Sequence, residues 1–423
     1  MKRSISVFLG TEQIGLIRYS VHGNRQSASF EYSNLWLANP KKYAIDPELP
    51  LVSGPQFHLR SSGQSLFHGA VSDTEPDGWG KKVILRDHAK RRKTLPGSEK
   101  PTILPLNELD FLLAVDDDSR VGALRFQDER GIFCRKSDSE KRTSPPLIEL
   151  RKLLAASHAV ETNTETSEDL RFLQGRGTSL DGLRPKCTII DDQGRLAIGK
   201  FPSVSDDRSV TKGEVLALRL AERAGINAAK AEVVVSDGIP IALIHRFDRT
   251  NTGERIMYVS CATMLGASAS DSKIHYYTDI VDTLRVVSQS AQADIEELWR
   301  RIAFSILITN VDDHLRNHGF LYVGNQQWRL SPAFDINPFP EKNREPKTWI
   351  SEEAGPQASI SGLMAVAPHF RISTKRAKAI ITEVDTAVAG WRAQGTKLGM
   401  TKLELDAFHA AFEHEERIAA QKL

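Results

Sequence analysis

Cysteine is scarce in this chain: its 423 residues include three, Cys134, Cys187 and Cys261, and no two of them form a C-x-x-C pair. Such widely spaced cysteines argue against a disulfide scaffold and against a cysteine-based metal site, and they fit a reducing compartment. Long apolar runs are also missing, since none approaches the roughly 20 residues that a membrane span requires. The opening segment MKRSISVFLG reaches a glycine too early to supply the apolar stretch of a signal peptide.

Neither sign of charge dominates the sequence. The 56 Lys and Arg residues are matched by 54 Asp and Glu residues, which leaves a net charge of +2. This balance argues against a nucleic-acid coat and against an acidic tail. We therefore expect a cytoplasmic, globular protein with no membrane association, built from about two or three domains at this length.

Several familiar enzyme motifs are absent as well. The sequence contains no G-x-S-x-G motif, which is typical of serine hydrolases. It also contains no G-x-x-x-x-G-K-[ST] motif, which is typical of Walker-type nucleotide sites. His314 and His318 have the i, i+4 spacing of a zinc pair. However, the segment HLRNH lacks the glutamate of H-E-x-x-H and follows a predicted helix instead of lying within one. Zinc chemistry is therefore disfavoured.

The first part of the chain is predicted to be rich in strands. Residues 4–19 contain two short apolar runs around a polar turn, which predicts a hairpin, and residues 27–37 predict a strand followed by a short helix. Asp77 and Gly78 could open a further helix, whose three inward-facing residues would be Val83, Ile84 and Leu85.

The composition changes between residues 127 and 146, where the chain is charged, bears Ser and Pro and shows little periodicity. We interpret this segment as a connection between an N-terminal domain, residues 1–126, and a larger C-terminal domain, residues 147–423. The larger domain begins with a predicted helix near 147–158.

Two hairpins and a helix are predicted next. The runs CTII and RLAIGKF flank the turn DDQG, and a second hairpin surrounds SDG within residues 231–247. Between them, residues 212–226 have helical spacing. After about residue 250 the chain is mostly helical, and residues 293–310 predict a helix that Asp294 and Glu297 would cap. The expected class is α+β, with a strand-rich small lobe to about residue 250 and a helical large lobe over 251–423.

The most informative segment is NVDDHLRNHGFLYV, with LSPAFDI following shortly after it. It places Asp312 and Asn317 five residues apart, with a second acid, Asp335, beyond an intervening hairpin. Phosphoryl transfer needs a carboxylate that receives the proton of the attacking hydroxyl, and a carboxylate and an amide that hold Mg²⁺. The D-x-x-x-x-N spacing matches the protein-kinase catalytic loop. Taken alone, the same spacing also occurs in ordinary loops after helices.

Upstream residues follow the order that a two-lobed kinase requires. Glycines that would let backbone amides approach phosphates precede a strand that ends in Lys200, as in the V-A-I-K strand of kinases. Glu214 begins the next helix and could pair with Lys200. The glycines of this loop are Gly175, Gly177 and Gly182.

With these motifs in place, the chain resembles the HipA family of bacterial serine/threonine kinases, the toxin half of type II toxin–antitoxin modules. The resemblance runs over nearly the whole chain. It rests on FLGTEQIGLI and SDTEPDGWG in the N-terminal part, and on TSLDGLRPK, LAIGKFP, IHRFDR, NVDDHLRNHGF and LSPAFDI in the remainder. It implies a kinase-like fold of two lobes, with a small β-rich N-terminal domain packed on a larger helical lobe.

The resemblance also implies roles for individual residues. Asp312 would be the catalytic base, Asn317 and Asp335 would bind magnesium, and Lys200 would contact the phosphates of ATP. The hinge at 245–247 would face adenine, and Asp248 would reach the ribose. Ser179 lies where family members autophosphorylate, an event that expels the glycine loop and stops activity. The implied cofactors are ATP and Mg²⁺, and the residues expected around the nucleotide are Asp181, Gly182, Lys186, Lys200, His245, Phe247, Asp248, His314, Asn317 and Asp335.

Two positions depart from the family pattern. Asp181 stands where small residues are usual, and its carboxylate would repel phosphates unless it points away. His245 stands where an acid occurs in the best-known relative, which we expect to matter little because backbone groups dominate at the hinge.

The resemblance implies partners as well. A HipB-like helix-turn-helix antitoxin would bind this chain and carry the contact with DNA, with two protomers bridging an antitoxin dimer. The substrate would be a translation component such as an aminoacyl-tRNA synthetase. Two alternatives stay open: a catalytically weak scaffold that binds an antitoxin and co-represses transcription, and a kinase acting on small molecules or lipids.

Overall fold

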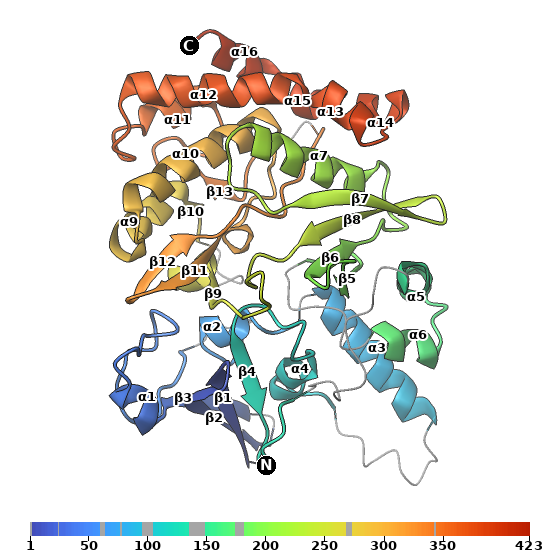
Figure 1. The fold of residues 1–423 in the computed structure, drawn as a ribbon, viewed down its shortest axis with the longest axis vertical. Helices are drawn as coiled ribbons and strands as arrows, with labels where there is room; N and C mark the ends of the chain where they lie inside the picture. Colours follow the sequence, from blue (N-terminus) through green and yellow to red (C-terminus); the bar gives the residue numbers. More distant parts are fainter. Residues whose placement is uncertain are drawn as a thin grey trace.

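The computed structural model describes residues 2–23, 25–59, 64–76, 78–94, 105–134, 149–173, 182–267, 273–341 and 344–423. The expected hairpin near the N-terminus is confirmed as β1 (Lys2–Leu9) and β2 (Glu12–His22), joined at Gly10 with a φ of +60°. With β3 (Arg25–Tyr32) and β4 (Leu124–Gln127) they form an antiparallel sheet of order β3-β2-β1-β4. This sheet lies at the bottom of Figure 1.

The helices described in this part of the chain are α1 (Asn34–Ala38), α2 (Gly69–Ser72), α3 (Gly78–Thr94) and α4 (Glu108–Ala114). The predicted helix from Gly78 is confirmed as α3. Val83 and Ile84 are buried as expected, but Leu85 is 50% exposed, so its inward placement was wrong. Three consecutive residues of a helix span about 200°, which is wider than the face that packs here.

The small lobe contains an antiparallel sheet of order β5-β6-β8-β7, which confirms both predicted hairpins. Alternate residues of β8 serve its two faces. Ile241 and Leu243 pack with α3, α5 and α6, whereas Ala242 and Ile244 join the main core on the side of α7. The elements are α5 (Leu150–Thr162), α6 (Ser167–Leu173), β5 (Lys186–Ile190), β6 (Leu196–Lys200), α7 (Val210–Arg223), β7 (Ala231–Ser236) and β8 (Ile239–His245).

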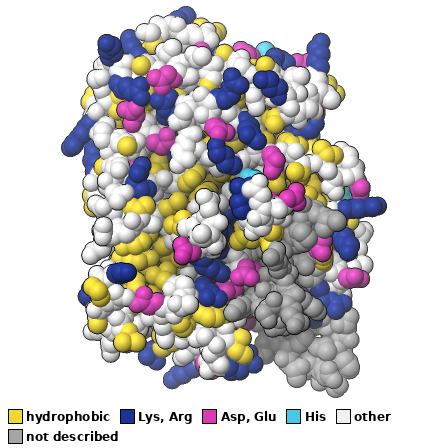
Figure 2. All heavy atoms as spheres, in the orientation of Figure 1, with side chains coloured by type: hydrophobic (Ala, Val, Ile, Leu, Met, Phe, Trp, Pro, Cys, Tyr) yellow, Lys and Arg dark blue, Asp and Glu magenta, His cyan; other side chains and the backbone are white. Residues whose placement is uncertain are grey.

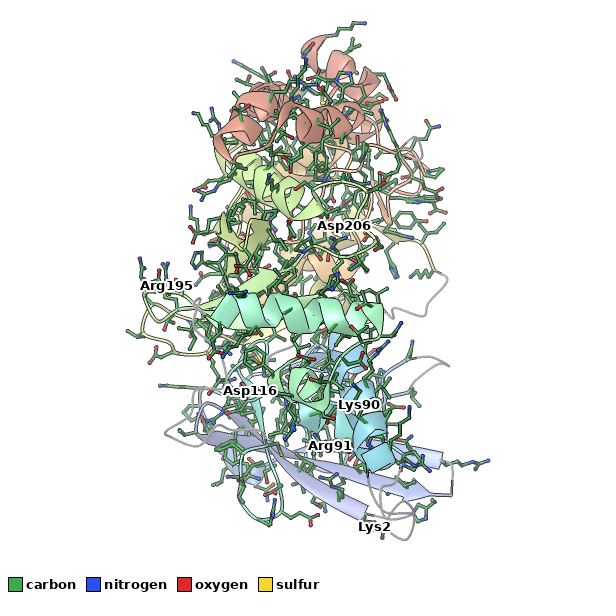
Figure 3. The ribbon with its side chains drawn as sticks, turned by 90° about the vertical axis from the view of Figure 1, so that its right-hand side faces the viewer. Lys2, Lys90, Arg91, Asp116, Arg195 and Asp206 are labelled. Atoms are coloured by element: carbon green, nitrogen blue, oxygen red, sulfur yellow. The ribbon has the colours of Figure 1, made fainter. Side chains whose placement is uncertain are left out.

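Helix α3 therefore packs with the small lobe, although it lies within the first 126 residues. Its Trp79 and Val83 belong to the same buried cluster as Leu153 of α5 and Ile189 of β5. Figure 3 places Lys90 and Arg91 of α3 beneath α5, and Arg195 near the tip of the β5–β6 hairpin.

The large lobe is mostly helical, as predicted, and forms the upper part of Figure 1. Its strands make a three-stranded sheet of order β12-β11-β9 and a parallel pair, β10 with β13. The elements are β9 (Tyr258–Ser260), α8 (Cys261–Met264), β10 (His275–Tyr276), α9 (Tyr277–Val287), α10 (Ala291–Leu307), β11 (Gly319–Gly324), β12 (Gln327–Leu330), β13 (Thr348–Trp349), α11 (Ile360–Ala365), α12 (Thr374–Ala389), α13 (Trp391–Lys397), α14 (Lys402–Ala407), α15 (His409–Phe412) and α16 (Glu415–Gln421).

The predicted capping of α10 was wrong. Ser290 occupies the N-cap position, and the Asp294 carboxylate accepts hydrogen bonds from the guanidinium of Arg329 instead. Glu297 accepts from the backbone amide of Asn227 and from Arg301. Both acids thus serve tertiary contacts that the local sequence does not reveal.

The surface agrees with the balanced charge. Figure 2 shows acidic and basic side chains interspersed over the upper, helical part, with hydrophobic side chains gathered at the left between that part and the N-terminal part. Among the helices that the structure describes, none has both the length and the apolar character needed to cross a bilayer.

Candidate functional site

An open pocket, about 610 Å³ including space that is continuous with solvent, lies between the small-lobe sheet and the large lobe. Seven of the residues expected around the nucleotide line it: Lys186, Lys200, His245, Phe247, Asp248, Asn317 and Asp335. Gly182, Asp312 and His314 are described but do not line it. Ser179 and Asp181, together with the glycines at 175 and 177, lie outside the described residues.

Lys200 is the charged centre of this pocket. It is the last residue of β6, and its Nζ lies 2.6 Å from Oε1 of Glu214 in α7 and 2.6 Å from Oδ1 of Asp335. The pairing expected between Lys200 and Glu214 is therefore present, together with a second acid that the large lobe supplies. A single ammonium group thus joins the two lobes.

Electrostatics differ at the two acids. Burial raises the pKa of Asp335, but the charges of Lys200 and Lys186 outweigh this effect and hold it at about 2. At Glu214 burial dominates, and its pKa is raised despite Lys200. Asp335 therefore stays ionised at neutral pH and can hold a cation.

Asp335 also has an uncommon backbone conformation. Its φ of +53° falls in the left-handed region, which a non-glycine residue adopts at a cost of about 1 kcal/mol or more. Asn337 Nδ2 donates to Asp335 Oδ1 at 3.3 Å. Such strain persists where surrounding contacts stabilise it, and here it places the carboxylate at Lys200.

The segment after α10 brings Asp312 and Asn317 together. A 3₁₀ turn over Leu315–Asn317 curls the chain back, and Asn317 Nδ2 donates to the backbone carbonyl of Asp312 at 3.0 Å. Asn317 is 5% exposed, and its Oδ1 is buried without a hydrogen-bond partner. A buried amide oxygen without a donor is costly, and a cation bound there would satisfy it.

These residues fit a magnesium ion that also takes ligands from a nucleotide. Mg²⁺ is commonly bound through one or two protein oxygens together with phosphates and water. Asn317 Oδ1 and the ionised Asp335 carboxylate would supply such oxygens. Among the described residues, no group of three or more His, Cys, Asp or Glu side chains is arranged to hold a metal by itself.

Asp312 is exposed at the edge of the loop. Partial burial raises its pKa, the nearby charge of Asp335 adds to this rise, and His314 and Lys347 oppose it. A carboxylate with a raised pKa is a better proton acceptor than an ordinary aspartate. Its position next to Asn317 is suited to receiving a proton from a hydroxyl.

The glycine loop ends at a tightly packed position. Gly182 has a φ of +124°, and a Cβ there would lie 2.7 Å from Lys186 Nζ. Its carbonyl accepts the backbone amide of Trp79 at 3.1 Å, so the start of α3 contacts the end of this loop. Lys186 is 3% exposed and lines the pocket beside Lys200.

The hinge and the adjoining Asp248 make more hydrogen bonds than expected. Both oxygens of Asp248 accept hydrogen bonds from Arg246, and Oδ2 also accepts from Arg249 and from the backbone amide of Gly122. The same arginines donate to the backbone carbonyls of residues 118, 119, 120 and 122. Asp248 thus fastens the hinge to the N-terminal part, a role that the proposed ribose contact did not anticipate.

The binding of Asp248 by Arg246 and Arg249 was not predicted, although the R-F-D-R string contained the signal. Five pocket-lining residues were also missed: Val121, Ile198, Ile244, Tyr258 and Phe334. An acid between two arginines in an apolar stretch indicates a buried ion pair. Phe247, between them, packs against Phe334 with ring centroids 5.4 Å apart. His245 lies with Nδ1 3.4 Å from Asp191 and Nε2 3.5 Å from Glu232.

The two histidines considered above as a zinc pair have different neighbours. His318 is buried, with Nε2 3.1 Å from Asp313 Oδ1, whereas His314 lies near Asp312 and Asp335. The site as a whole combines a lysine between two acids, a buried amide oxygen, and an exposed carboxylate. These are the groups that bind phosphates with a divalent cation and accept a proton.

Comparison with known proteins agrees with this chemistry. A 353-residue alignment to "Putative kinase Y4mE" of Sinorhizobium fredii is 23% identical and covers 79% of this chain and 77% of that protein. A "Putative kinase" of Haemophilus influenzae is 24% identical over 190 residues, 39% of this chain and 55% of that protein.

The fold has a solved counterpart. HipA of Shewanella oneidensis, solved with HipB and its operator DNA, superimposes with a TM-score of 0.61 at 15% identity, covering 98% of this chain and 96% of HipA. The expected HipA-like fold is confirmed. The sequence model described as "HipA-like C-terminal domain" matches residues 178–391, which include every pocket residue named above. Since this match spans half of the sequence, the chain belongs to the HipA family.

Proposed function

We propose that this protein is an ATP- and Mg²⁺-dependent serine/threonine kinase that acts on proteins. The observation that carries the proposal is the position of Lys200 between Glu214 and Asp335 on the wall of the interlobe pocket. A lysine paired with a helix acid and facing a metal-binding acid is the arrangement that active kinases need. The kinase names of the relatives support the same reading.

In this mechanism each residue has a separate task. Lys200 and Lys186 contact the phosphates and offset their charge. Asn317 and Asp335 would hold Mg²⁺, which when bound neutralises charge on the β- and γ-phosphates. Asp312 orients the substrate hydroxyl and accepts its proton, for which its raised pKa is suited.

We further propose that the kinase is the toxin of a type II toxin–antitoxin module. Its likeness to HipA, which was solved with HipB and operator DNA, supports a helix-turn-helix antitoxin as partner. By the same resemblance, a translation component such as an aminoacyl-tRNA synthetase would be the substrate, and Ser179 would be the autophosphorylation site. Both stay predictions.

Incubation of the full-length chain with labelled ATP, Mg²⁺ and host extract tests the activity. We expect phosphate on protein, and a loss of at least about 100-fold in Asp312→Asn, because the proton acceptor is removed. Binding of a fluorescent ATP analogue should persist in this variant, because Asp312 does not line the pocket.

Other outcomes would contradict the proposal. Label on a metabolite or lipid with none on protein would indicate the small-molecule kinase. A folded protein that binds the antitoxin and incorporates no label under any condition would indicate the scaffold.

A further inference from the structure

The loop that carries Asp312 and Asn317 has a second pair of residues on its inner side. The chain neighbour of each is buried: Asp313, next to Asp312, is 5% exposed, and His318, next to Asn317, is 3% exposed. Asp313 and His318, the buried pair, thus each follow one of the two proposed functional residues along the chain. None of the roles assigned so far uses the buried pair.

The buried pair is in direct contact. His318 Nε2 lies 3.1 Å from Asp313 Oδ1, so the two side chains bridge the turn over Leu315–Asn317. The other carboxylate oxygen, Oδ2, accepts the hydroxyl of Tyr277 in α9 and the hydroxyl of Ser305 in α10, the latter at 3.3 Å. The rings of Tyr277 and His318 pack edge to face with centroids 5.8 Å apart.

The backbone at both ends of the turn is held as well. The Asp313 carbonyl accepts the hydroxyl of Thr348 at 2.7 Å, and the His318 carbonyl accepts the amide of Cys261 at 2.8 Å. Gly319, the next residue, lies so close to Tyr258 that a Cβ would come within 2.1 Å of its ring. The loop is therefore held by contacts with α8, α9, α10 and β13.

Asp313 carries a buried charge that its partners stabilise. Burial raises the pKa of Asp313, but His318 and the hydroxyl of Tyr277 outweigh this effect, so its pKa is lowered. Burial and the same carboxylate raise the pKa of Tyr277 well above 10, so its hydroxyl remains a donor. An ionised buried carboxylate is tolerated only where partners satisfy it, and its removal leaves those partners unsatisfied.

We propose that Asp313 and His318, with Tyr277, form a positioning unit that sets the separation of Asp312 and Asn317. The inference rests on the kinase function proposed above. Because the pair bridges the same turn that the Asn317–Asp312 hydrogen bond bridges, a change of length or charge in it moves both functional residues. Displacements of about 1 Å at such groups can lower rates about 100-fold.

The test compares three variants of the full-length chain. Asp313→Asn keeps the shape and removes the charge, and Tyr277→Phe removes one hydroxyl from a ring that otherwise stays packed. Asp294→Asn is the matched control, since Asp294 is 2% exposed and paired with Arg329, but lies at the end of α10 away from the loop. Phosphate transfer from labelled ATP to myelin basic protein yields kcat and the KM for ATP.

We expect kcat to fall about 10- to 100-fold in Asp313→Asn and about threefold to tenfold in Tyr277→Phe, with the KM for ATP changed less than about threefold. The control should lose thermal stability without this change in kcat. A double variant, Asp313→Asn with His318→Gln, should be no slower than Asp313→Asn, because the two residues act as one unit.

Two results would overturn the proposal. In the first, Tyr277→Phe has a kcat within twofold of wild type, and Asp313→Asn is either unfolded or as active as wild type. The other is a kcat loss in Asp294→Asn as large as in Asp313→Asn.

Hydrogen exchange separates this proposal from the kinase assignment, because it needs no activity. Amides of residues 310–320 should exchange at least about tenfold faster in Asp313→Asn than in wild type. If wild type is inactive but Asp313→Asn exchanges faster than wild type, the kinase assignment is rejected and the positioning unit stands. If wild type is active but Asp313→Asn exchanges no faster than wild type, only the positioning unit is rejected.

Discussion

The carboxylate of Asp248 accepts the backbone amide of Gly122 at 2.7 Å, which ties the hinge of the kinase core to a segment 126 residues earlier. Arg246 and Arg249 complete the contact through the carbonyls of the same segment. The side chains of Arg246 and Asp248 are each 2% exposed, so this connection is a buried ionic cluster and not a surface salt bridge. The N-terminal part is therefore integral to the geometry of the hinge.

Asp248→Asn should lower the free energy of unfolding by about 3 kcal/mol, because it leaves two buried guanidinium groups without a counter-charge. Urea denaturation followed by tryptophan fluorescence measures the change. Asp406→Asn is the control, since its partner Arg392 and Asp406 itself are both more than 40% exposed, and it should cost less than about 1 kcal/mol. Equal costs for the two variants would refute the structural role of Asp248.

Lys200→Met should lower phosphate transfer at least about 100-fold, because it removes the ammonium that we propose contacts the phosphates. The substitution also leaves the buried Glu214 and the half-buried Asp335 without the positive charge between them. This should lower the free energy of unfolding by about 3 kcal/mol. Adding Glu214→Gln should restore part of the stability and none of the activity. If the second change restored transfer, Lys200 would not be a phosphate contact.

Gly182→Ala should raise the KM for ATP severalfold, because a Cβ would press against Lys186 Nζ. Gly238→Ala serves as the control: Gly238 also has a positive φ, +77°, but the space around its Cβ position is open, so a Cβ there meets no neighbour. Steady-state kinetics with varied ATP compare the two. A similar KM in both variants would show that the packing at Gly182 does not affect the nucleotide.

Lys347→Met should move the acidic limb of the pH–rate profile to higher pH. In the proposed mechanism Asp312 must be ionised to accept a proton, so the rate should fall as pH drops through the pKa of this residue. Lys347 lowers that pKa, and its removal allows the pKa to rise further. Because Lys347 is exposed, the shift should shrink at high salt. Lys397→Met, on the exposed surface of α13, should leave the limb where it is.

Local patterns were enough to predict the elements and the candidate residues. The hairpin of β7 and β8 and the helical spacing of α10 are properties of short segments, so both were predicted correctly. The spacing of Asp312, Asn317 and Asp335 singled out the loop, and the order of motifs suggested the partner of Lys200. Each of these inferences uses residues whose arrangement depends on covalent geometry and periodicity.

Contacts between distant segments could not be obtained in this way. Nothing near Asp248 indicates that it binds Gly122, nothing near Asp294 indicates Arg329, and nothing near Trp79 places α3 in the core of the small lobe. A buried charge takes whichever partner the packing of the whole chain brings within reach, because its desolvation must be offset. The sequence by itself determined which groups could perform phosphoryl transfer, and the tertiary structure alone decided which of them face the pocket and which hold it together.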